Sequence, residues 1–532
     1  MLQVSSWLFR RFEPRSVLPR VALLIVIPAL LSFPISSSIQ RPYIALPFVF
    51  FTYWAGSVFF TLAYRLSPFH PLAQHPGPLI HKLSKWWAAY ISFRGDQHRY
   101  YKRLHDRYGD VVRIGPNELS ICDASLIHSV LGQDGLPKGP RWDGRTPTLL
   151  AQRDPVKHLH LRKPWNRAFS SAALKEYEVI LASRTRQLVN CLGDLVHESG
   201  RNDGAVLDIA AWFIYFSTDF MGDMAFGGGF ELMEAGGDTD GVLALIESGL
   251  RISGAVAHVP YVMPFLAAVR GKKDSMQRSR TFGRERVLKR LEIGAIRKDL
   301  FYYLSGEGLP ESDRPSVNEV AQNGLVAIIA GSDTTRSTLT AVIYYLLLNR
   351  AAYERLQEEV DSAFPSGEEP LGVLKLSQME WLNGCINEAL RLQPPVPSGS
   401  QRSVNKGKGA KVLGKLVIPE ETQLFLHTYS IHRDRRYFHA PEAFLPERWL
   451  SKGAPAGEHN TAAFIPFSYG PAGCAGKNLG LMEMRIVLCW VLRRFQFSKV
   501  PRISYEEWEG KFQDWFVMKV DPLPVNVSIR NV

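Results

Sequence analysis

The apolar residues of this chain follow two patterns: long uncharged runs near the amino end, and helical spacing further on. Residues 21–38 form one uncharged apolar run, and residues 43–64 form a second that is rich in phenylalanine. Because about 20 apolar residues cross a bilayer as a helix, each run predicts a transmembrane helix. A secretory signal peptide is the competing interpretation of the first run, but no small-residue cleavage site precedes the second.

The basic residues beside these runs predict their orientation. Four arginines lie within residues 1–20, Arg41 alone lies between the runs, and further basic residues follow from Arg65 onward. Positive flanks prefer the cytosol, so we expect a cytosolic tail, a helical hairpin and a body on the cytosolic side. Prolines in residues 65–80 cannot continue a helix and predict a stiff hinge before a body that spans residues 81–532.

Helices dominate the predicted body. Apolar residues recur at helical spacing from Val317 to Leu348 and from Leu479 to Phe495, and Pro394 ends a third helical stretch. The chain shows no internal repeat, so we expect one mainly α domain with small β-sheets. Short apolar runs between turn signals predict four strands, at Val111–Ile114, Leu119–Cys122, Lys415–Ile418 and Gln423–His427.

The predicted helix at 317–348 breaks its own pattern in the middle. The segment Ala330-Gly-Ser-Asp-Thr-Thr335 places glycine, a carboxylate and two threonines where a buried helix prefers alanine or leucine. Such a segment is either a tolerated polar kink or a functional feature. Threonine hydroxyls can bond to backbone carbonyls and bend a helix, which opens room for a small ligand or water.

Cys474 carries the clearest candidate chemistry. It lies in a loop that runs from Phe467 to Gly476, just before an amphipathic run. Helix-end N–H groups stabilise a thiolate, which binds soft metals and iron, while the flanking glycines let the backbone approach a flat cofactor. The alternative is a small buried hydrophobe. The five cysteines are scattered without metal-finger spacing, which favours a reducing compartment.

Four ordered motifs resemble those of the cytochrome P-450 family, and the resemblance covers nearly everything from Pro76 onward. It implies a cytochrome P-450 fold with haem b between the long central helix and the cysteine loop, as in membrane-bound fungal members. The motifs are Phe-x-x-Gly-x-x-x-Cys-x-Gly at 467–476, Ala-Gly-Ser-Asp-Thr-Thr at 330–335, Glu388-x-x-Arg391, and Phe-x-Pro-Glu-Arg-Trp at 444–449.

The resemblance assigns a role to each motif residue. Asp333 relays protons, and Thr334 hydrogen-bonds the dioxygen that is being activated. A buried network of Glu388, Arg391 and Arg448 assembles the haem pocket, since bidentate guanidinium geometry suits that role. In the cysteine loop, the iron ligand is Cys474, and the residues that border the cofactor are Phe467, Gly470 and Gly476.

The haem propionates need cations, and here the chain departs from the family pattern. The family usually has arginine or histidine two residues before the cysteine, whereas this chain has Ala472. Arg162 and Arg402 match family arginines at the haem edge, and His158 takes a position that is usually tryptophan. Either another cation compensates for Ala472, or the haem is held more loosely because a charge-assisted hydrogen bond of about 1.5–3 kcal/mol is missing.

The net charge of +12 suits nucleic acid, a membrane surface or an acidic partner. We exclude nucleic acid, because the chain has no recognition motif and its basic residues are spread out. The densest basic run, Arg270–Arg290, predicts a solvated helix face. The resemblance implies an acidic NADPH-dependent reductase, with cytochrome b5 as a second donor, that docks on the cysteine side near Lys163, Lys477 and Arg485.

The implied function is a monooxygenase of the endoplasmic reticulum membrane whose catalytic domain faces the cytosol. It hydroxylates or epoxidises an apolar small molecule, in fungal secondary metabolism of a terpenoid, polyketide or aromatic substrate or in xenobiotic oxidation. Two alternatives are a family member that rearranges its substrate without external electrons and a haem sensor without catalysis. Asp333 and Thr334 argue against the first alternative, and only Ala472 favours the second.

Overall fold

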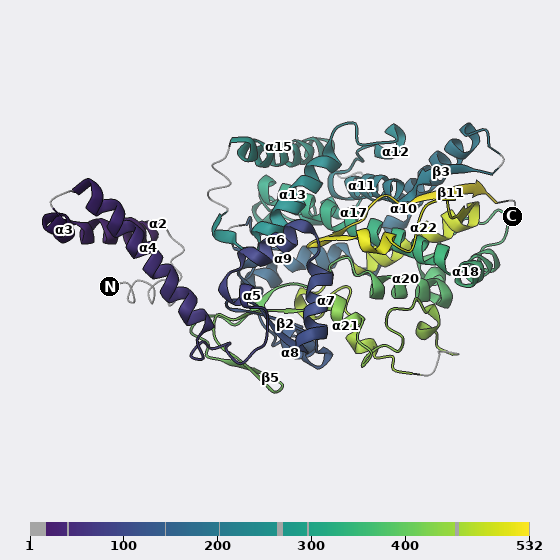
Figure 1. The fold of residues 1–532 in the computed structure, drawn as a ribbon. Coiled ribbons are helices and arrows are strands. Elements are labelled where there is room, and N and C mark those ends of the chain that lie inside the picture. Colours follow the sequence, from purple (N-terminus) through teal and green to yellow (C-terminus); the bar gives the residue numbers. More distant parts are fainter. Residues whose placement is uncertain are drawn as a thin grey trace.

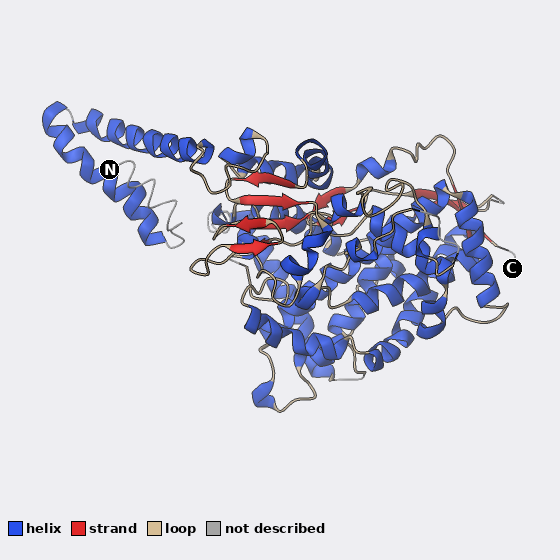
Figure 2. Cartoon of the chain, turned by 90° about the horizontal axis from the view of Figure 1, so that it is seen from below, coloured by secondary structure: helices blue, strands red, loops and turns tan. Residues whose placement is uncertain are grey.

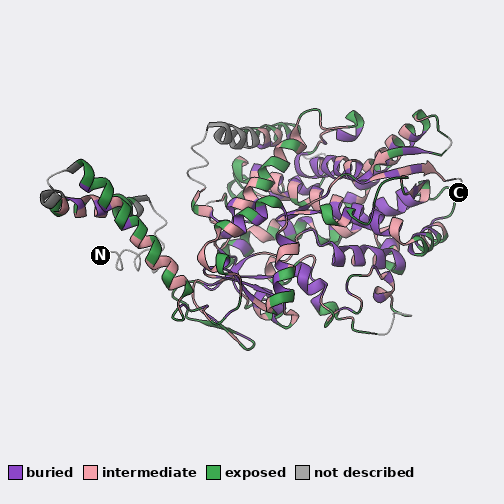
Figure 3. Ribbon diagram, viewed as in Figure 1, coloured by how far each residue is buried: buried purple, intermediate pink, exposed green. Residues whose placement is uncertain are grey.

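The computed structural model describes residues 17–39, 42–143, 145–201, 203–262, 270–294, 297–452 and 457–530. Most of the predicted cytosolic tail, up to residue 16, lies outside these ranges. Figure 1 shows an elongated body from which the amino-terminal helices project at one end. Large apolar side chains on these projecting helices are exposed, whereas those in the body are largely buried (Figure 3).

The amino-terminal helices form a hairpin. The first arm contains α2 (Val17–Val21), a π-helical turn at Ala22–Val26 and α3 (Ile27–Ile39), and the second arm is α4 (Pro42–Leu66). The Tyr53 hydroxyl donates to the Leu23 carbonyl at 2.8 Å, and the Trp54 indole donates to the Leu24 carbonyl at 3.1 Å. Among the described residues, Tyr43–Leu66 is long and apolar enough to cross a membrane, while the apolar segment of the first arm, Ala22–Ile35, is shorter.

The body begins earlier than the predicted hinge allows. The backbone N–H of Arg113 donates to the Pro76 carbonyl at 2.7 Å, which joins this segment to the first strand. Gly77 has a φ of +159°, and a Cβ atom there would lie 2.3 Å from the Arg113 carbonyl oxygen. Leu72 is also buried, in one hydrophobic cluster with Leu119 of β2 and Val130 of α8. The chain is therefore packed on the body from Leu72 onward, within the predicted hinge of residues 65–80.

Helices make up most of the body, and Figure 2 shows them filling one side while the larger sheet lies nearest the hairpin. This arrangement confirms the predicted mainly α fold. The body helices are α5 (Leu79–Leu83), α6 (Trp86–Arg94), α7 (Gln97–Tyr108), α8 (Ile127–Leu131), α9 (Pro155–Ala168), α10 (Ser171–Glu198), α11 (Ile209–Phe226), α12 (Leu232–Ala235), α13 (Val242–Val256), α15 (Arg270–Ile293), α16 (Leu300–Ser305), α17 (Val317–Leu348), α18 (Arg350–Ala363), α19 (Val373–Gln378), α20 (Glu380–Leu392), α21 (Thr428–His432) and α22 (Lys477–Arg494).

The strands form four small sheets. A four-stranded sheet has the order β1-β2-β7-β4, in which only β2 and β7 pair in parallel, and a three-stranded sheet has the order β3-β11-β8. Strands β5–β6 and β9–β10 form two hairpins. The four predicted strands are confirmed as β1 (Val111–Gly115), β2 (Glu118–Ile121), β6 (Leu416–Ile418) and β7 (Gln423–Leu426), and the others are β3 (Ala205–Asp208), β4 (Arg402–Ser403), β5 (Lys411–Leu413), β8 (Phe495–Ser498), β9 (Gln513–Trp515), β10 (Val517–Lys519) and β11 (Pro524–Ile529).

The long helix α17 crosses the core against α11. A capping box fixes its start, where the Ser316 hydroxyl accepts from the backbone of Glu319 and the Glu319 carboxylate accepts from the Ser316 backbone. The helix continues unbroken to Leu348 through its polar middle. Gly331 has a packing reason to be there, because a Cβ atom would lie 2.6 Å from the Met221 sulfur on α11.

Candidate active site

The cysteine loop is held in shape by its own backbone. The N–H of Cys474 donates to the Phe467 carbonyl at 2.9 Å, and the N–H of Gly473 donates to the Gly470 carbonyl at 2.9 Å. Gly470 has a φ of +71°, and a Cβ atom there would lie 2.0 Å from the Leu131 carbonyl oxygen. Glycine is therefore required at this turn, which presents Cys474 just ahead of α22.

Cys474 is exposed, whereas Cys122, Cys385 and Cys489 are buried and Cys191 is partly buried. Although the residue has exposed surface, the protein atoms around its sulfur desolvate the thiolate and raise the pKa of the Cys474 thiol. The same pKa is lowered by the backbone N–H groups of Gly476 and Lys477 and by the side-chain charges of Arg162 and Lys477. The loop thus supplies the N–H groups and cations that a thiolate needs, as the sequence predicted for a helix start.

The polar middle of α17 is built from hydroxyls that bond to the helix backbone. The Thr334 hydroxyl donates to the Ala330 carbonyl at 2.6 Å. Ser332 and Ser217 on α11 donate to each other's backbone carbonyls, both at 3.2 Å. These bonds satisfy the polar groups, so α17 carries the segment without a break in its helical assignment.

Asp333 lines a cavity of about 220 Å³ between α17, α11, α13 and the β9–β10 hairpin. The pKa of this carboxyl is raised to about 6, mainly by burial. The nearby charge of Arg336 acts to lower the pKa, and the charge of Glu247 acts to raise it. The two cations of this cavity bond to groups other than Asp333: Arg336 donates to the Val520 carbonyl, and Lys519 pairs with Glu247. The raised pKa lets a fraction of the Asp333 carboxyl groups hold a proton near neutral pH.

Glu483 is a buried carboxyl that the sequence argument did not identify. It lies on α22, and the Thr335 hydroxyl of α17 donates to one of its oxygens at 3.2 Å. Its other oxygen has no partner among the described residues, and burial raises the pKa of Glu483 well above its ordinary value. A lone acid inside the apolar run that begins at Leu479 was the available signal. The neutral carboxyl ties the cysteine helix to the polar middle of α17.

This burial predicts that Glu483→Gln stabilises the protein at neutral pH. The folded state keeps the Glu483 proton above pH 4.5, whereas the unfolded chain releases it. As the pH rises from the unfolded pKa towards the folded pKa, the free energy of unfolding therefore falls by about 1.4 kcal/mol for each pH unit. Glutamine stays neutral, so the thermal midpoint of the variant should exceed that of the parent at pH 7.5 and approach it at pH 5. An equal difference in thermal midpoint between variant and parent at pH 7.5 and pH 5 would contradict this explanation. The matched control is Glu358→Gln, a change at an exposed acid.

The structure brings Glu388, Arg391 and Arg448 together. Arg391 donates to both Glu388 oxygens, at 3.0 and 2.8 Å, and Arg448 donates to one of them at 3.1 Å. The Trp449 indole and the Leu445 N–H also donate to this carboxylate. Burial alone would raise the Glu388 pKa, but Arg391 and Arg448 outweigh it and hold the pKa below its ordinary value. The carboxylate accepts bonds on both oxygens and remains charged.

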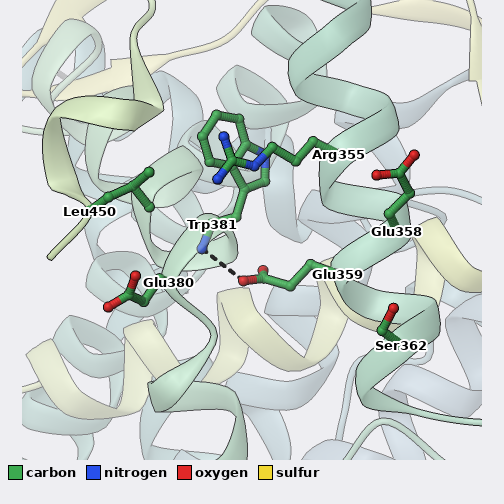
Figure 4. Close-up of a pocket in the computed structure, with 7 residues that line it drawn as sticks. All are labelled: Arg355, Glu358, Glu359, Ser362, Glu380, Trp381 and Leu450. Atoms are coloured by element: carbon green, nitrogen blue, oxygen red, sulfur yellow. Dashed lines mark hydrogen bonds between the residues drawn. The ribbon is translucent and has the colours of Figure 1, made fainter. Parts of the chain in front are cut away.

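The helix that carries Glu388 and Arg391 is fixed at its start by α18. Figure 4 shows Glu359 accepting a hydrogen bond from the backbone N–H of Trp381, in the first turn of α20. The distance of this bond is 2.9 Å, and the other Glu359 oxygen accepts from the Leu382 N–H at 2.7 Å. The Arg355 guanidinium lies 3.8 Å from the centre of the Trp381 ring. A carboxylate suits the positive end of a helix. Glu359 lines a surface recess between α18 and the start of α20. Its carboxylate is there to hold the start of α20.

Three predicted cofactor residues meet beside the cysteine loop, together with a lysine that the sequence did not single out. Arg162 of α9 donates to the Gly473 carbonyl at 2.6 Å. Buried His158, also on α9, has its pKa lowered to about 4 by burial and by Lys138, Arg162 and Arg402. At neutral pH, His158 therefore offers this cluster a hydrogen bond and no charge. Arg402 of β4 is 4% exposed, and its Nε has no partner among the described residues.

Two expectations about basic surfaces are corrected by the packing. Arg485 is half-buried and donates to the Asn383 side chain at 2.7 Å, so it is not a free docking cation, whereas Lys163 and Lys477 are exposed. In the basic run, Arg290 is 4% exposed and pairs with Asp299 at 3.1 Å. The run is thus only partly a solvated face. The side chains of residues 270–280 lie outside the described part.

The chain is similar to known proteins over most of its length. The family model of cytochrome P-450 matches residues 76–523. The chain is similar to cytochrome P-450 monooxygenase FCK2 of Fusarium pseudograminearum, with 32% identity over 89% of this chain and 85% of the relative. Cytochrome P-450 67 of Uromyces fabae is 32% identical over 86% of each chain, and monooxygenase poxM of Penicillium oxalicum is 32% identical over 84% of this chain and 87% of the relative. The matched range begins at Pro76, where the structure joins the chain to β1, and includes Cys474.

Proposed function

Because the chain belongs to the cytochrome P-450 family, we propose that it binds haem b through the Cys474 thiolate and oxygenates an apolar small molecule. Family membership makes the chain a monooxygenase, an oxidoreductase that incorporates oxygen from dioxygen. A bound haem supplies the oxidation, and a thiolate ligand favours cleavage of the O–O bond. The observation that carries the assignment of Cys474 is its exposure at the start of α22, among N–H groups and cations.

The residues around Cys474 fit a haem. The turn at Gly470 and the small Gly476 let the loop backbone approach a flat group, while Phe467 borders it. Arg162, Arg402 and neutral His158 form a polar edge in which a buried Arg402 N–H is unpaired. Such an edge suits the two carboxylates of a haem. We assign Glu388, Arg391 and Arg448 to the assembly of this pocket.

Asp333 and Thr334 are assigned to proton delivery. The Asp333 carboxyl takes a proton from the polar side of its cavity, where Arg336, Lys519 and Glu247 lie. Thr334 holds its own hydroxyl hydrogen on the Ala330 carbonyl, which leaves its oxygen lone pairs free to accept from water or from a protonated group. Together the two side chains can pass protons toward the dioxygen that is being reduced.

We assign the electrons to an NADPH-dependent reductase, with cytochrome b5 as a second donor. Exposed Lys163 and Lys477 lie on the cysteine side of the body and suit an acidic partner. The hairpin of α3 and α4 anchors the body in a membrane, which we take to be the endoplasmic reticulum with the body in the cytosol. The hydrogen bonds of Tyr53 and Trp54 to the first arm support a two-pass hairpin, because backbone carbonyls in lipid need donors.

The substrate proposal is an apolar terpenoid, polyketide or aromatic molecule of secondary metabolism, or a xenobiotic. It is supported by fungal relatives that are named monooxygenases and by apolar residues of the Asp333 cavity, such as Trp515 and Met518. The test is expression in microsomes with a reductase and a panel of such molecules. A reduced, CO-treated protein should show the thiolate-type Soret band, and products should require NADPH. Products formed without NADPH would indicate the rearranging alternative, and loss of the thiolate band would indicate the sensor.

Asp333→Asn should lower turnover about a hundredfold and remove its dependence on pH. Burial raises the Asp333 pKa to about 6, so about a tenth of the carboxyl groups hold a proton at pH 7 and fewer do as pH rises. Parent turnover should therefore fall above pH 6, whereas the asparagine variant should be slow and flat. The measurement is NADPH-dependent product formation from pH 5.5 to 8.5 with saturating reductase.

Asp238→Asn is the matched control, because Asp238 lines the same cavity. It should keep the parent pH profile. If Asp333→Asn retained the decline above pH 6, another group would be the source of the protons. The rate of first reduction, trapped with CO, should be equal in all three proteins, which separates proton delivery from electron delivery.

A further inference from the structure

The cysteine loop has Ala472 two residues before Cys474, where the family usually has an arginine or histidine beside the haem carboxylates. Ala472 ends the short 3₁₀ turn Gly470–Ala472, directly before Gly473 and Cys474. The Gly473 carbonyl already accepts from Arg162 at 2.6 Å, so this arginine is partly committed to the loop itself. The edge therefore needs a further positive group from another part of the chain.

Backbone pairing places Lys138 beside Arg402. Lys138 and Arg402 form an antiparallel bridge, the N–H of Ser403 donates to the Pro137 carbonyl at 3.0 Å, and the N–H of Gly139 donates to the Gln401 carbonyl at 2.9 Å. This pairing extends β4 of the four-stranded sheet by one further segment. It brings the loop after α8 to the same edge that Arg402 occupies.

The Lys138 ammonium is buried and has one N–H left to donate. Lys138 is 7% exposed, and its Nζ donates to the Leu149 carbonyl at 2.8 Å and to the Leu150 carbonyl at 2.7 Å. An ammonium has three donors, so one remains after these two bonds. The carbonyls hold the ammonium in place, and they carry no net charge to balance it.

The charge at this edge is unbalanced. Burial, Arg402 and Arg162 together lower the Lys138 pKa to about 7, and no acid contributes to that shift. None of the salt bridges between described residues includes Lys138, Arg162 or Arg402. Buried cations are normally paired, since an unpaired charge is costly to desolvate. An anionic group at this edge would balance three cations at once.

We propose that Lys138 supplies the cation that position 472 lacks and, with Arg402, holds a haem carboxylate. The inference rests on the proposed haem site and extends it to a residue on a different loop. Lys138 offers its remaining N–H and Arg402 its unpaired Nε to the carboxylate, while His158 adds a neutral donor from α9. The consequence is that haem retention depends on Lys138 and that an arginine at position 472 can replace it.

The test measures the rate at which full-length protein in detergent loses haem to an excess of apomyoglobin. Lys138→Met should speed haem loss about tenfold to a hundredfold, as expected for a charge-assisted hydrogen bond. The double variant with Lys138→Met and Ala472→Arg should recover most of this loss. Exposed Lys157→Met, on α9, is the matched control and should behave as the parent.

Haem dimethyl ester separates the proposed role from a structural one. It has no free carboxylate, so the parent and Lys138→Met should lose it at equal rates. A faster loss of the ester from Lys138→Met, by the same factor as for haem, would overturn the proposal and assign Lys138 to its bonds with Leu149 and Leu150. Unchanged loss of haem would overturn it as well.

Folding failure would also be decisive. If Lys138→Met yields no folded protein, recovery of folded haem protein by adding Ala472→Arg supports the proposal, and its absence overturns it. The thiolate-type CO spectrum of the parent is independent of every Lys138 result. Failure of the haem site itself is thus distinguishable from failure of this inference.

Discussion

Cys474→Ala is expected to abolish oxygenation and the thiolate-type CO spectrum. Alanine removes the sulfur and leaves the loop intact, because the bonds from Cys474 to Phe467 and from Gly473 to Gly470 use backbone atoms alone. The N–H groups at the start of α22 and the Arg162 charge then face no thiolate. Product formation should fall below detection, since the thiolate is what favours cleavage of the O–O bond. The two measurements are the reduced CO difference spectrum and NADPH-dependent product formation.

Cys191→Ala provides the control for loss of a thiol in itself. Cys191 is partly buried on α10, where its thiol lies 3.7 Å from the Met233 carbonyl. Its variant should keep both the spectrum and the product. Continued product formation by Cys474→Ala would remove Cys474 from the chemistry, whereas loss of both signals in Cys191→Ala would show that the assay reports stability.

Features that are local in the sequence were predictable. The helix at Val317–Leu348 was predicted with the observed bounds, because its apolar residues recur at regular helical spacing. The cysteine loop and the Glu388–Arg391 pair were also visible, since each occupies a few neighbouring residues. Periodicity and short motifs report on the backbone near them, so these elements could be read directly.

Features that depend on chains meeting in space were not predictable. Lys138 gains its significance from a backbone bridge to Arg402, which lies 264 residues further on. The sequence shows Glu483 only as a lone acid in an apolar run, and its burial and its bond to Thr335 follow from the packing of α22 on α17. The strands β8 to β11 near the carboxyl end were missed because they are defined by pairing: β11 lies between β8 and the distant β3, and the short strands β9 and β10 pair with each other.

The site is assembled from two tied layers. Glu483 and Thr335 join α22 to α17 on one side, and Arg162 joins α9 to the cysteine loop on another. In the second layer, the Glu388 carboxylate accepts hydrogen bonds from Arg391 of α20 and from Arg448. The contacts of Glu483 with Thr335, of Arg162 with Gly473 and of Glu388 with Arg448 each join segments that are far apart in sequence.

Glu388→Gln is expected to destabilise the folded protein by about 3–5 kcal/mol, because it leaves two buried guanidinium groups without their carboxylate. The glutamine matches glutamate in shape, but its amide NH₂ cannot accept from Arg391 or Arg448. Arg391 would keep its bonds to the carbonyls of His432 and Pro441, at 2.8 and 2.6 Å, so its charge stays buried. The expected result is little haem-bound protein and a markedly lower thermal midpoint.

Acid should have a similar effect on the parent. The arginines hold the Glu388 pKa below its ordinary value, so the stabilisation is present above the unfolded pKa and is lost as pH falls through the lower folded value. Glu358→Gln, an exposed acid on α18, should leave haem content and midpoint unchanged. Glu388→Gln with a parent-like midpoint would mean that the carbonyl bonds of Arg391 hold the layer without the carboxylate. The Glu388 charge is then dispensable, and the network is a packing feature of α20.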